Sequence, residues 1–427
     1  MSDYAQSRKS ATIEPAYVNV YSVDKGAGPL EMAFVTLWMF IIYLPLDMFS
    51  PLRYLCILGF VALIVHDNQK LLPLMAKSWP LFALPIFGLW SVGWSNYPSE
   101  ALRAGILLLL TPIVSLVIAG RLTPQQFLRT VMFAGMIATV CSVPYMAFFN
   151  FGGLYGSKNL FAIQMLFCFI LCLIAVLNQD ESPFIRILAL PFVPVCFYFQ
   201  YLGESATTLV FAIVGGAALI GIKLFWMPVT KVKSLPTLTL LLLVAALLAA
   251  SLIILNMPDN QFMAKFLSLV GKDATLTGRT ELWDGARMVS DEHPWLGVGL
   301  EGFWQADTGL AQTLNENNFK PIGTKLGFHN SFWDVRVHLG LIGLLLFIWF
   351  IMWTSIRMVH LWFVDGSLLN SALLIILAVN LTMGFTESYL WGTFTTSLAI
   401  QTLAGIAPFR LHDPKLVGRA KIREKIA

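Results

Sequence analysis

The residues best suited to chemistry in this sequence lie in and beside one long hydrophilic segment, from about residue 256 to 328. Arg279, Trp283 and Arg287 are spaced four residues apart in a stretch with a helical pattern, so they lie broadly on one helix face. A planar guanidinium can hold a diphosphate by two parallel hydrogen bonds. Arg279 is therefore a candidate for binding such an anion, with Trp283 and Arg287 beside it. The alternative is that Arg279 extends to the phosphates of membrane lipids.

His329 closes the hydrophilic segment and is followed by Asn330 and an apolar helix that contains Gly340 and Gly343. An unperturbed imidazole changes its charge near about pH 6.5, which makes His329 a candidate proton acceptor. The alternative is a structural histidine that caps or hydrogen-bonds the helix start. Asn330 is a candidate for binding a substrate beside it.

Polar residues elsewhere stand at the ends of apolar segments. Lys158 and Asn159 follow a glycine-rich turn in the stretch GGLYGSKNLFA, where the glycines would let a ligand approach the backbone. Glu204 and Glu387 are acidic residues at the ends of other helices. Ionisable residues near membrane depth are candidates for function, so all four are predicted to contribute to a binding site.

The composition decides what kind of fold carries these residues. Of the 427 residues, 57% are hydrophobic and 12% are charged, whereas an ordinary soluble domain has about 25% charged residues. Many apolar runs approach the roughly 20 residues that cross a bilayer as a helix. We therefore expect an all-α integral membrane protein. The net charge of +4 is small, so it does not suggest that the protein binds nucleic acid.

About twelve transmembrane helices are expected, nine before the hydrophilic segment and three after it. The predicted domains are a leader (1–29), helices one to nine (30–255), the hydrophilic loop (256–328), helices ten to twelve (329–407) and a basic tail (408–427). The apolar spans lie at about 31–46, 54–66, 80–95, 101–119, 127–149, 160–177, 184–202, 206–226, 236–255, 332–356, 367–386 and 389–407.

The distribution of Lys and Arg predicts the orientation. With the leader inside, the inner loops and tail hold eighteen Lys and Arg and the short outer loops hold three. Cytoplasmic loops carry the excess of positive charge, so both termini are predicted to be cytoplasmic and the long loop to face outward.

The long loop is predicted to be a compact lid over the membrane, too short for an independent catalytic domain of typical size. Residues 279–292 should form a helix that ends at His293-Pro294, followed by a glycine-rich turn, whereas 312–325 is polar and expected to be mobile. Asp291, Glu292 and His293 are adjacent and cannot all face one ion, so neither a metal nor another cofactor is expected. The five cysteines fall in apolar runs and suggest no disulfide framework.

Several of these motifs together resemble a known family. GRTELWDGARMVSDEHPWLGVGLEGF followed by HNSFWDVRVHLGLIGLLLFI is similar to the signature region of the superfamily of O-antigen ligases and Wzy polymerases. GGLYGSKNLFA resembles the Lys-Asn motif of the ExoQ-type exopolysaccharide polymerases within it. The order and spacing of the motifs are more specific than each motif alone.

The resemblance implies a GT-C-like helical fold and metal-independent, inverting glycosyl transfer at the outer face of the bacterial inner membrane. The donor would be an oligosaccharide on undecaprenyl diphosphate. Arg279 would hold the diphosphate, His329 would activate or orient the acceptor hydroxyl, and Lys158 would support the diphosphate or its first sugar. Membrane lipids, a flippase and a chain-length co-polymerase are the partners that the resemblance implies.

One departure separates the alternatives. Ligases of the superfamily usually carry a Ser-Arg pair near the start of a middle helix, where this chain reads GESATT at 203–208. The missing arginine favours a polymerase over a ligase that transfers to lipid A-core. A transporter or flippase for polysaccharide precursors is the alternative from another class, but such proteins place polar groups near the bilayer midplane. A structural scaffold would leave the Arg279, His329 and Lys158 pattern without a purpose.

Overall fold

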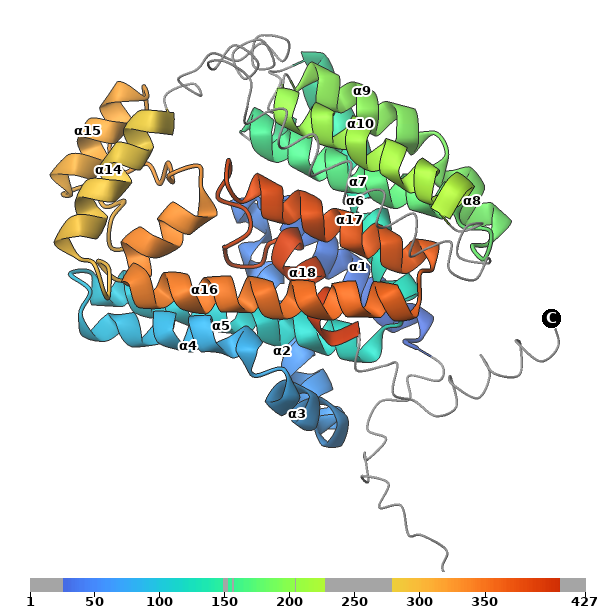
Figure 1. Cartoon of the computed structure of the whole chain (residues 1–427), viewed down its shortest axis with the longest axis horizontal. Helices are drawn as coiled ribbons and strands as arrows, with labels where there is room; N and C mark the ends of the chain where they lie inside the picture. The colour runs from blue at the N-terminus through green and yellow to red at the C-terminus, as the bar shows by residue number, and fades with distance from the viewer. Residues whose placement is uncertain (1–25, 149–152, 156, 204, 227–278, 408–427) are drawn as a thin grey trace, which may run out of the picture.

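The computed structural model describes residues 26–148, 153–155, 157–203, 205–226 and 279–407 (Figure 1). All regular elements in these ranges are helices, as the sequence predicts. The first ten are α1 (Pro29–Tyr43), α2 (Ser50–His66), α3 (Asn68–Lys77), α4 (Pro80–Trp90), α5 (Pro98–Arg121), α6 (Pro124–Phe148), α7 (Lys158–Leu177), α8 (Pro183–Ala189), α9 (Phe192–Leu202) and α10 (Ala206–Gly221). The later ones are α14 (Arg279–Glu292), α15 (Gly309–Asn317), α16 (Ser331–Val364), α17 (Leu368–Met383) and α18 (Thr396–Ile406).

The described helices have the length and composition of a multi-pass membrane protein. Seven helical stretches are long and apolar enough to cross a bilayer, or eight if the bent pair Asn68–Lys77 and Pro80–Gly93 is one span. Four of the seven are α5, α6, α7 and α16, and the other three combine neighbouring elements as Asp47–His66, Pro183–Leu202 and Thr207–Phe225. The helices α1, α17 and α18 are shorter apolar helices. The predicted span at 236–255 lies outside the described residues, so the total of twelve stays a prediction.

The last predicted span, 389–407, is wrong as drawn from the sequence. Residues 384–395 form an irregular loop between α17 and α18, and the helix begins only at Thr396. This loop contains Gly384, Glu387 and Gly392, the last with a φ of 155°. Hydrophobicity counted these residues as membrane-spanning because Tyr389, Leu390 and Trp391 are apolar. Their neighbours are polar or glycine, and a membrane protein tolerates non-helical backbone where other parts of the protein surround it.

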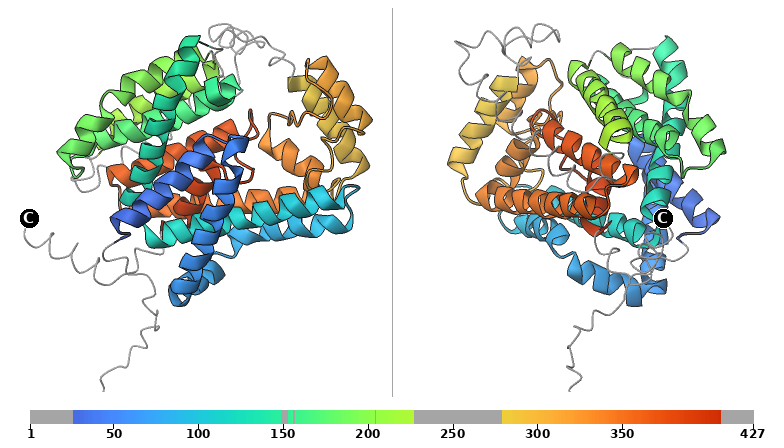
Figure 2. Two further views of the ribbon diagram at one scale, coloured as in Figure 1. Left: turned by 180° about the vertical axis from the view of Figure 1, so that it is seen from behind. Right: turned by 45° about the vertical axis from the view of Figure 1, so that its right-hand side comes forward.

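The long helix α16 is a centre of the arrangement. It packs against α4, α17 and α18, and α17 in turn contacts α7 and α10 (Figure 1). Seen from behind and after a turn of 45°, α7 to α10 form a group separate from α4 and α5 (Figure 2). At its N-terminal end α16 contacts α14. The segments before and after the hydrophilic loop therefore meet around one helix.

A break in α16 ties the lid to the membrane helices. Gly340 has φ 64° and ψ −162°, so four hydrogen bonds to residues 294–299 replace the helical pattern there. Val298 and Gly299 donate to the carbonyls of Val337 and His338 (3.0 and 2.9 Å), and Leu341 and Ile342 donate to the carbonyls of Pro294 and Trp295 (2.9 and 3.3 Å). We call residues 294–299 the insert. The backbone groups that the break frees are thus satisfied by the glycine-rich turn.

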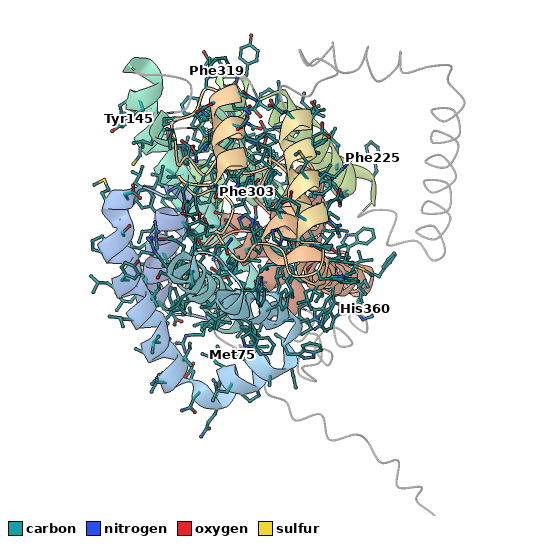
Figure 3. The ribbon with its side chains drawn as sticks, turned by 90° about the vertical axis from the view of Figure 1, so that its left-hand side faces the viewer. Met75, Tyr145, Phe225, Phe303, Phe319 and His360 are labelled. Atoms are coloured by element: carbon teal, nitrogen blue, oxygen red, sulfur yellow. The ribbon has the colours of Figure 1, made fainter. Side chains whose placement is uncertain are left out.

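The described part of the lid, residues 279–328, packs around a small core that also includes Val337 of α16. Leu282 and Ala286 of α14 pack with Leu314 of α15 and with Phe303 and Phe328; the lid is viewed with its side chains in Figure 3, where Phe303 is labelled. The expectation for 312–325 is corrected in part, because Gly309–Asn317 forms α15. The sequence did not indicate this helix because α15 is mostly polar and contributes few apolar residues to that core, namely Leu310, Ala311 and Leu314.

The insert leads to a prediction about stability. A Cβ at Gly297, where φ is 66°, would lie 2.5 Å from the carbonyl oxygen of Val337 and 2.6 Å from the nitrogen of Gly340. We expect Gly297→Ala to lower the free energy of unfolding by about 2 kcal/mol or more, because strain and the steric clash add. Thermal unfolding in detergent micelles measures this. Gly309→Ala is the control, since a Cβ there meets nothing within 4 Å; equal midpoints for the two variants would contradict the prediction.

Candidate active site

The carboxylate of Glu387 joins four separate segments of the chain. It lies in the loop between α17 and α18, and Glu387 is only 7% exposed. Arg279 Nη2 donates to its Oε1 at 2.5 Å, Asn159 Nδ2 donates to the same oxygen at 3.2 Å, and His329 Nδ1 lies 3.0 Å from Oε2. Three residues that the sequence predicts for the site therefore converge on a fourth.

Arg279 is the first residue of α14 and is 8% exposed. A buried guanidinium requires a counter-charge, and Glu387 supplies it. Because a guanidinium has five N–H donors, the bond to Glu387 leaves others for an anion. The alternative interpretation from the sequence was that Arg279 extends to the phosphates of membrane lipids. A side chain that does so would be exposed, whereas Arg279 is buried.

His329 lies in the turn that joins the lid to α16, and its side chain is 30% exposed. A carboxylate only accepts hydrogen bonds, so its contact with Glu387 assigns the proton of a neutral imidazole to Nδ1. The other ring nitrogen, Nε2, then carries no proton, and its lone pair can accept one. This pairing of carboxylate and imidazole is the arrangement that lets a histidine act as a general base.

Asn159 lies in the first turn of α7, where Ser157 Oγ caps the helix by accepting from the backbone N–H of Leu160 at 3.4 Å. The preceding residue, Lys158, is exposed and begins the same helix. The helix start thus presents one residue to Glu387 and places a cation next to it in sequence.

The remaining predicted residues have other surroundings. Trp283 Nε1 donates to the carbonyl of Phe328 at 3.0 Å. Asn330 is the N-cap of α16, since its Oδ1 accepts from the N–H groups of Phe332 and Trp333 (2.9 and 3.2 Å) while its Nδ2 donates to the carbonyl of Phe385 (3.1 Å). Arg287 is exposed on α14, and Glu204 lies outside the described residues. The structure thus gives Asn330 a helix-capping contact, and its predicted binding role stays a prediction.

A second ion pair of the lid differs from the first in its exposure. Lys325 Nζ lies 2.7 Å from Glu301 Oε2, with side chains 52% and 36% exposed. Burial alone raises the pKa of the Glu301 carboxyl, but the charges of His338, Lys325 and Arg103 outweigh it and hold the pKa below its ordinary value. Among the described residues, no group of three or more His, Cys, Asp or Glu could hold a metal ion.

Sequence reasoning did not find that Glu387 is the common partner of the other residues, nor that Asp334 lies near them. Asn159 and Glu387 are 228 residues apart and His329 and Glu387 are 58 apart, so no local spacing signals the contact. Asp334 is in the first turn of α16 and accepts from the N–H of Phe328 at 3.0 Å. The position of an acidic residue only five residues after His329 was the sequence signal that could have placed Asp334 near the site.

These features define a multi-pass helical membrane protein in which a buried Arg-Glu pair and a partly exposed histidine lie where the lid meets the membrane helices. A family model described as O-antigen ligase matches residues 160–348. The chain is 30% identical over 295 residues to the exopolysaccharide production protein ExoQ of Rhizobium meliloti (strain 1021), and the alignment covers 66% of each chain. The chain belongs to the O-antigen ligase and Wzy polymerase superfamily and is similar to ExoQ. Both matches indicate a membrane glycosyltransferase of the polymerase or ligase type.

The buried ion pair leads to a prediction about stability. We expect Glu387→Leu to lower the free energy of unfolding by about 3–5 kcal/mol, because it leaves the charge of Arg279 buried without a partner. The double variant with Arg279→Leu should regain most of this loss, since no buried charge remains. Denaturant unfolding in detergent measures both. Glu301→Gln, at the exposed pair, is the control and should cost at most about 1 kcal/mol; a similar cost for Glu387→Leu would contradict the prediction.

Proposed function

We propose that the protein polymerises oligosaccharide repeat units carried on undecaprenyl diphosphate, at the outer face of the bacterial inner membrane. The observation that carries the proposal is the convergence of Arg279, His329 and Asn159 on Glu387. It combines a cation for a diphosphate with a base for a hydroxyl, and these are the two needs of glycosyl transfer from a lipid diphosphate. Both termini would be cytoplasmic and the lid would lie over the site on the outer side.

In the proposed reaction, His329 Nε2 takes the proton of an acceptor sugar hydroxyl. The hydroxyl oxygen forms a bond to the anomeric carbon of the donor glycan, and the bond from that carbon to the diphosphate oxygen breaks. The electron pair leaves with the lipid diphosphate, and direct attack inverts the anomeric centre. Glu387, at 3.0 Å from Nδ1, stabilises the imidazolium that forms.

Arg279 has two tasks in this proposal. Its bond to Glu387 orients the guanidinium, and its remaining N–H groups compensate the charge that develops on the leaving diphosphate. A hydrogen-bond donor that is already positioned lowers the activation barrier because no solvent must reorganise during the reaction. Lys158 supplies a second positive charge from the start of α7. The proposal needs neither a metal nor another cofactor.

Two observations favour a polymerase over a ligase. The similar protein is named for exopolysaccharide production, and the Ser-Arg pair typical of ligases is missing at 203–208. The alternative is an O-antigen ligase that transfers a lipid-linked glycan to lipid A-core. A precursor transporter is the alternative from another class, and the position of the charged cluster near the lid speaks against it.

The reaction is tested with purified protein and a lipid-linked repeat unit, followed by sizing of the products. A ladder of products supports a polymerase. A single transfer to added lipid A-core would show that the protein is a ligase and would contradict the proposed polymerase activity. The proposed enzyme activity would be contradicted if no glycan were transferred to either acceptor by protein that a thermal unfolding measurement shows to be folded.

The two central residues give a prediction for this assay. We expect His329→Ala to lower the rate by about 10²–10⁴-fold, because a general base is lost. Arg279→Ala should lower it by about 10²–10³-fold, because charge on the leaving group is no longer compensated. His360→Ala, an exposed histidine near the other end of α16, is the matched control. Near-normal product from either site variant, at equal protein level, would show that its residue has no such role.

Lys158 gives a separate prediction. We expect Lys158→Ala to raise the KM for the lipid-linked donor and to lower product yield, because it removes a cation next to the proposed diphosphate site. Steady-state kinetics at varied donor concentration measures this. Lys320→Ala, at an exposed lysine of the lid, is the control. Unchanged polymer output from Lys158→Ala would exclude Lys158 from the site.

A further inference from the structure

We propose that Trp283 and Asp334 are positioning residues that fix His329 by holding Phe328, the residue before it. This inference rests on the proposed function, since it explains how the base of that reaction is held. Neither residue hydrogen-bonds to Glu387 in the described part of the chain, and the two come from different elements, α14 and α16. Their common point is the backbone of Phe328.

The turn that carries His329 has an unusual backbone. Gly327 has φ 72° and His329 has φ 48°, both in the left-handed region. Glycine adopts such angles freely, but only a few per cent of other residues do. A residue keeps this conformation when its surroundings over-determine it, and such residues cluster at functional sites. The position of His329 therefore depends on what holds the turn.

Phe328 is held at three points. Its N–H donates to Asp334 Oδ1 at 3.0 Å, and its carbonyl accepts from Trp283 Nε1 at 3.0 Å. Its ring is fully buried, with centroids 5.1 Å from those of Phe303 and Trp304. Both peptide groups and the side chain are thus fixed, so the peptide that leads into His329 has one orientation.

The burial of Asp334 favours a role beyond packing. The residue is 4% exposed, and a buried carboxylate costs free energy unless hydrogen bonds compensate it. Its bond to Phe328 reaches back six residues, from the first turn of α16 to the turn ahead of it. An apolar side chain would fill the space but could not orient that N–H.

The consequence is geometric coupling between the lid and the base. Trp283 belongs to the helix that begins with Arg279, whereas Asp334 belongs to the helix that follows His329. Through Phe328 the two helices set the position of the imidazole relative to Glu387. Without them the turn can relax to common backbone angles, and a displacement of about 1 Å at a reacting group can cost about 100-fold in rate.

The test uses three variants of the full chain. Trp283→Phe removes the N–H donor and keeps an aromatic ring, and Asp334→Leu removes the acceptor and keeps a side chain branched at Cγ. We expect each to lower kcat by about 10- to 100-fold with the KM for the lipid-linked donor unchanged. Asp334→Asn retains an Oδ1 acceptor and should keep kcat near the wild-type value. A merely structural role would lower thermal stability without this split between kcat and KM.

A second measurement does not depend on activity. Diethyl pyrocarbonate labels accessible histidines, and peptide mapping by mass spectrometry gives the rate at each one. In Trp283→Phe and Asp334→Leu the rate at His329 should rise severalfold relative to His293 and His360, which are exposed in the structure. Unchanged kcat together with unchanged labelling of His329 would overturn the proposal. If the wild type transfers no glycan, the proposed function fails and the labelling alone decides whether Phe328 is held in this way.

Discussion

One buried carboxylate determines how the polar parts of this membrane protein fit together. Glu387 compensates the charge of Arg279 and also contacts His329 and Asn159, so the start of α7, the start of α14, the turn before α16 and the loop after α17 share one partner. Each of these groups would be costly to bury alone. Their mutual satisfaction explains why a charged cluster can lie below the protein surface in a chain with so few charges.

The fold class could be predicted from the sequence because the apolar runs are long and few charges interrupt them. Arg279 and His329 could be singled out as candidates because Arg279 opens a helix and His329 lies in the turn just before one. The common partner could not be found, since Glu387 lies 108 residues from Arg279 and 58 residues from His329 in the chain. The last span was misplaced for a related reason. Hydrophobicity cannot distinguish apolar residues that face lipid from apolar residues, such as Leu390, that are buried around an irregular loop.

The hydrophilic segment is better understood as a part of the membrane bundle than as an appended domain. Its aromatic core includes Phe328 and extends to Val337 of α16, and Tyr97, just before α5, donates to Asp307 at 2.5 Å. A lid joined so closely to the helices can position its side chains against them without folding separately. The positions of Arg279, at the start of its described part, and of His329, directly after its end, are therefore fixed relative to each other.

The insert has a consequence for how related chains can differ in length. Four of its backbone groups take the places of helical hydrogen-bond partners in α16, so each residue from Pro294 to Gly299 has a set register against Val337–Ile342. Adding or removing one residue there would shift every bond by one position and turn Gly297 away from Gly340, where the two backbones leave no room for a side chain. Natural insertions and deletions should accumulate on either side of this short stretch and leave its length constant.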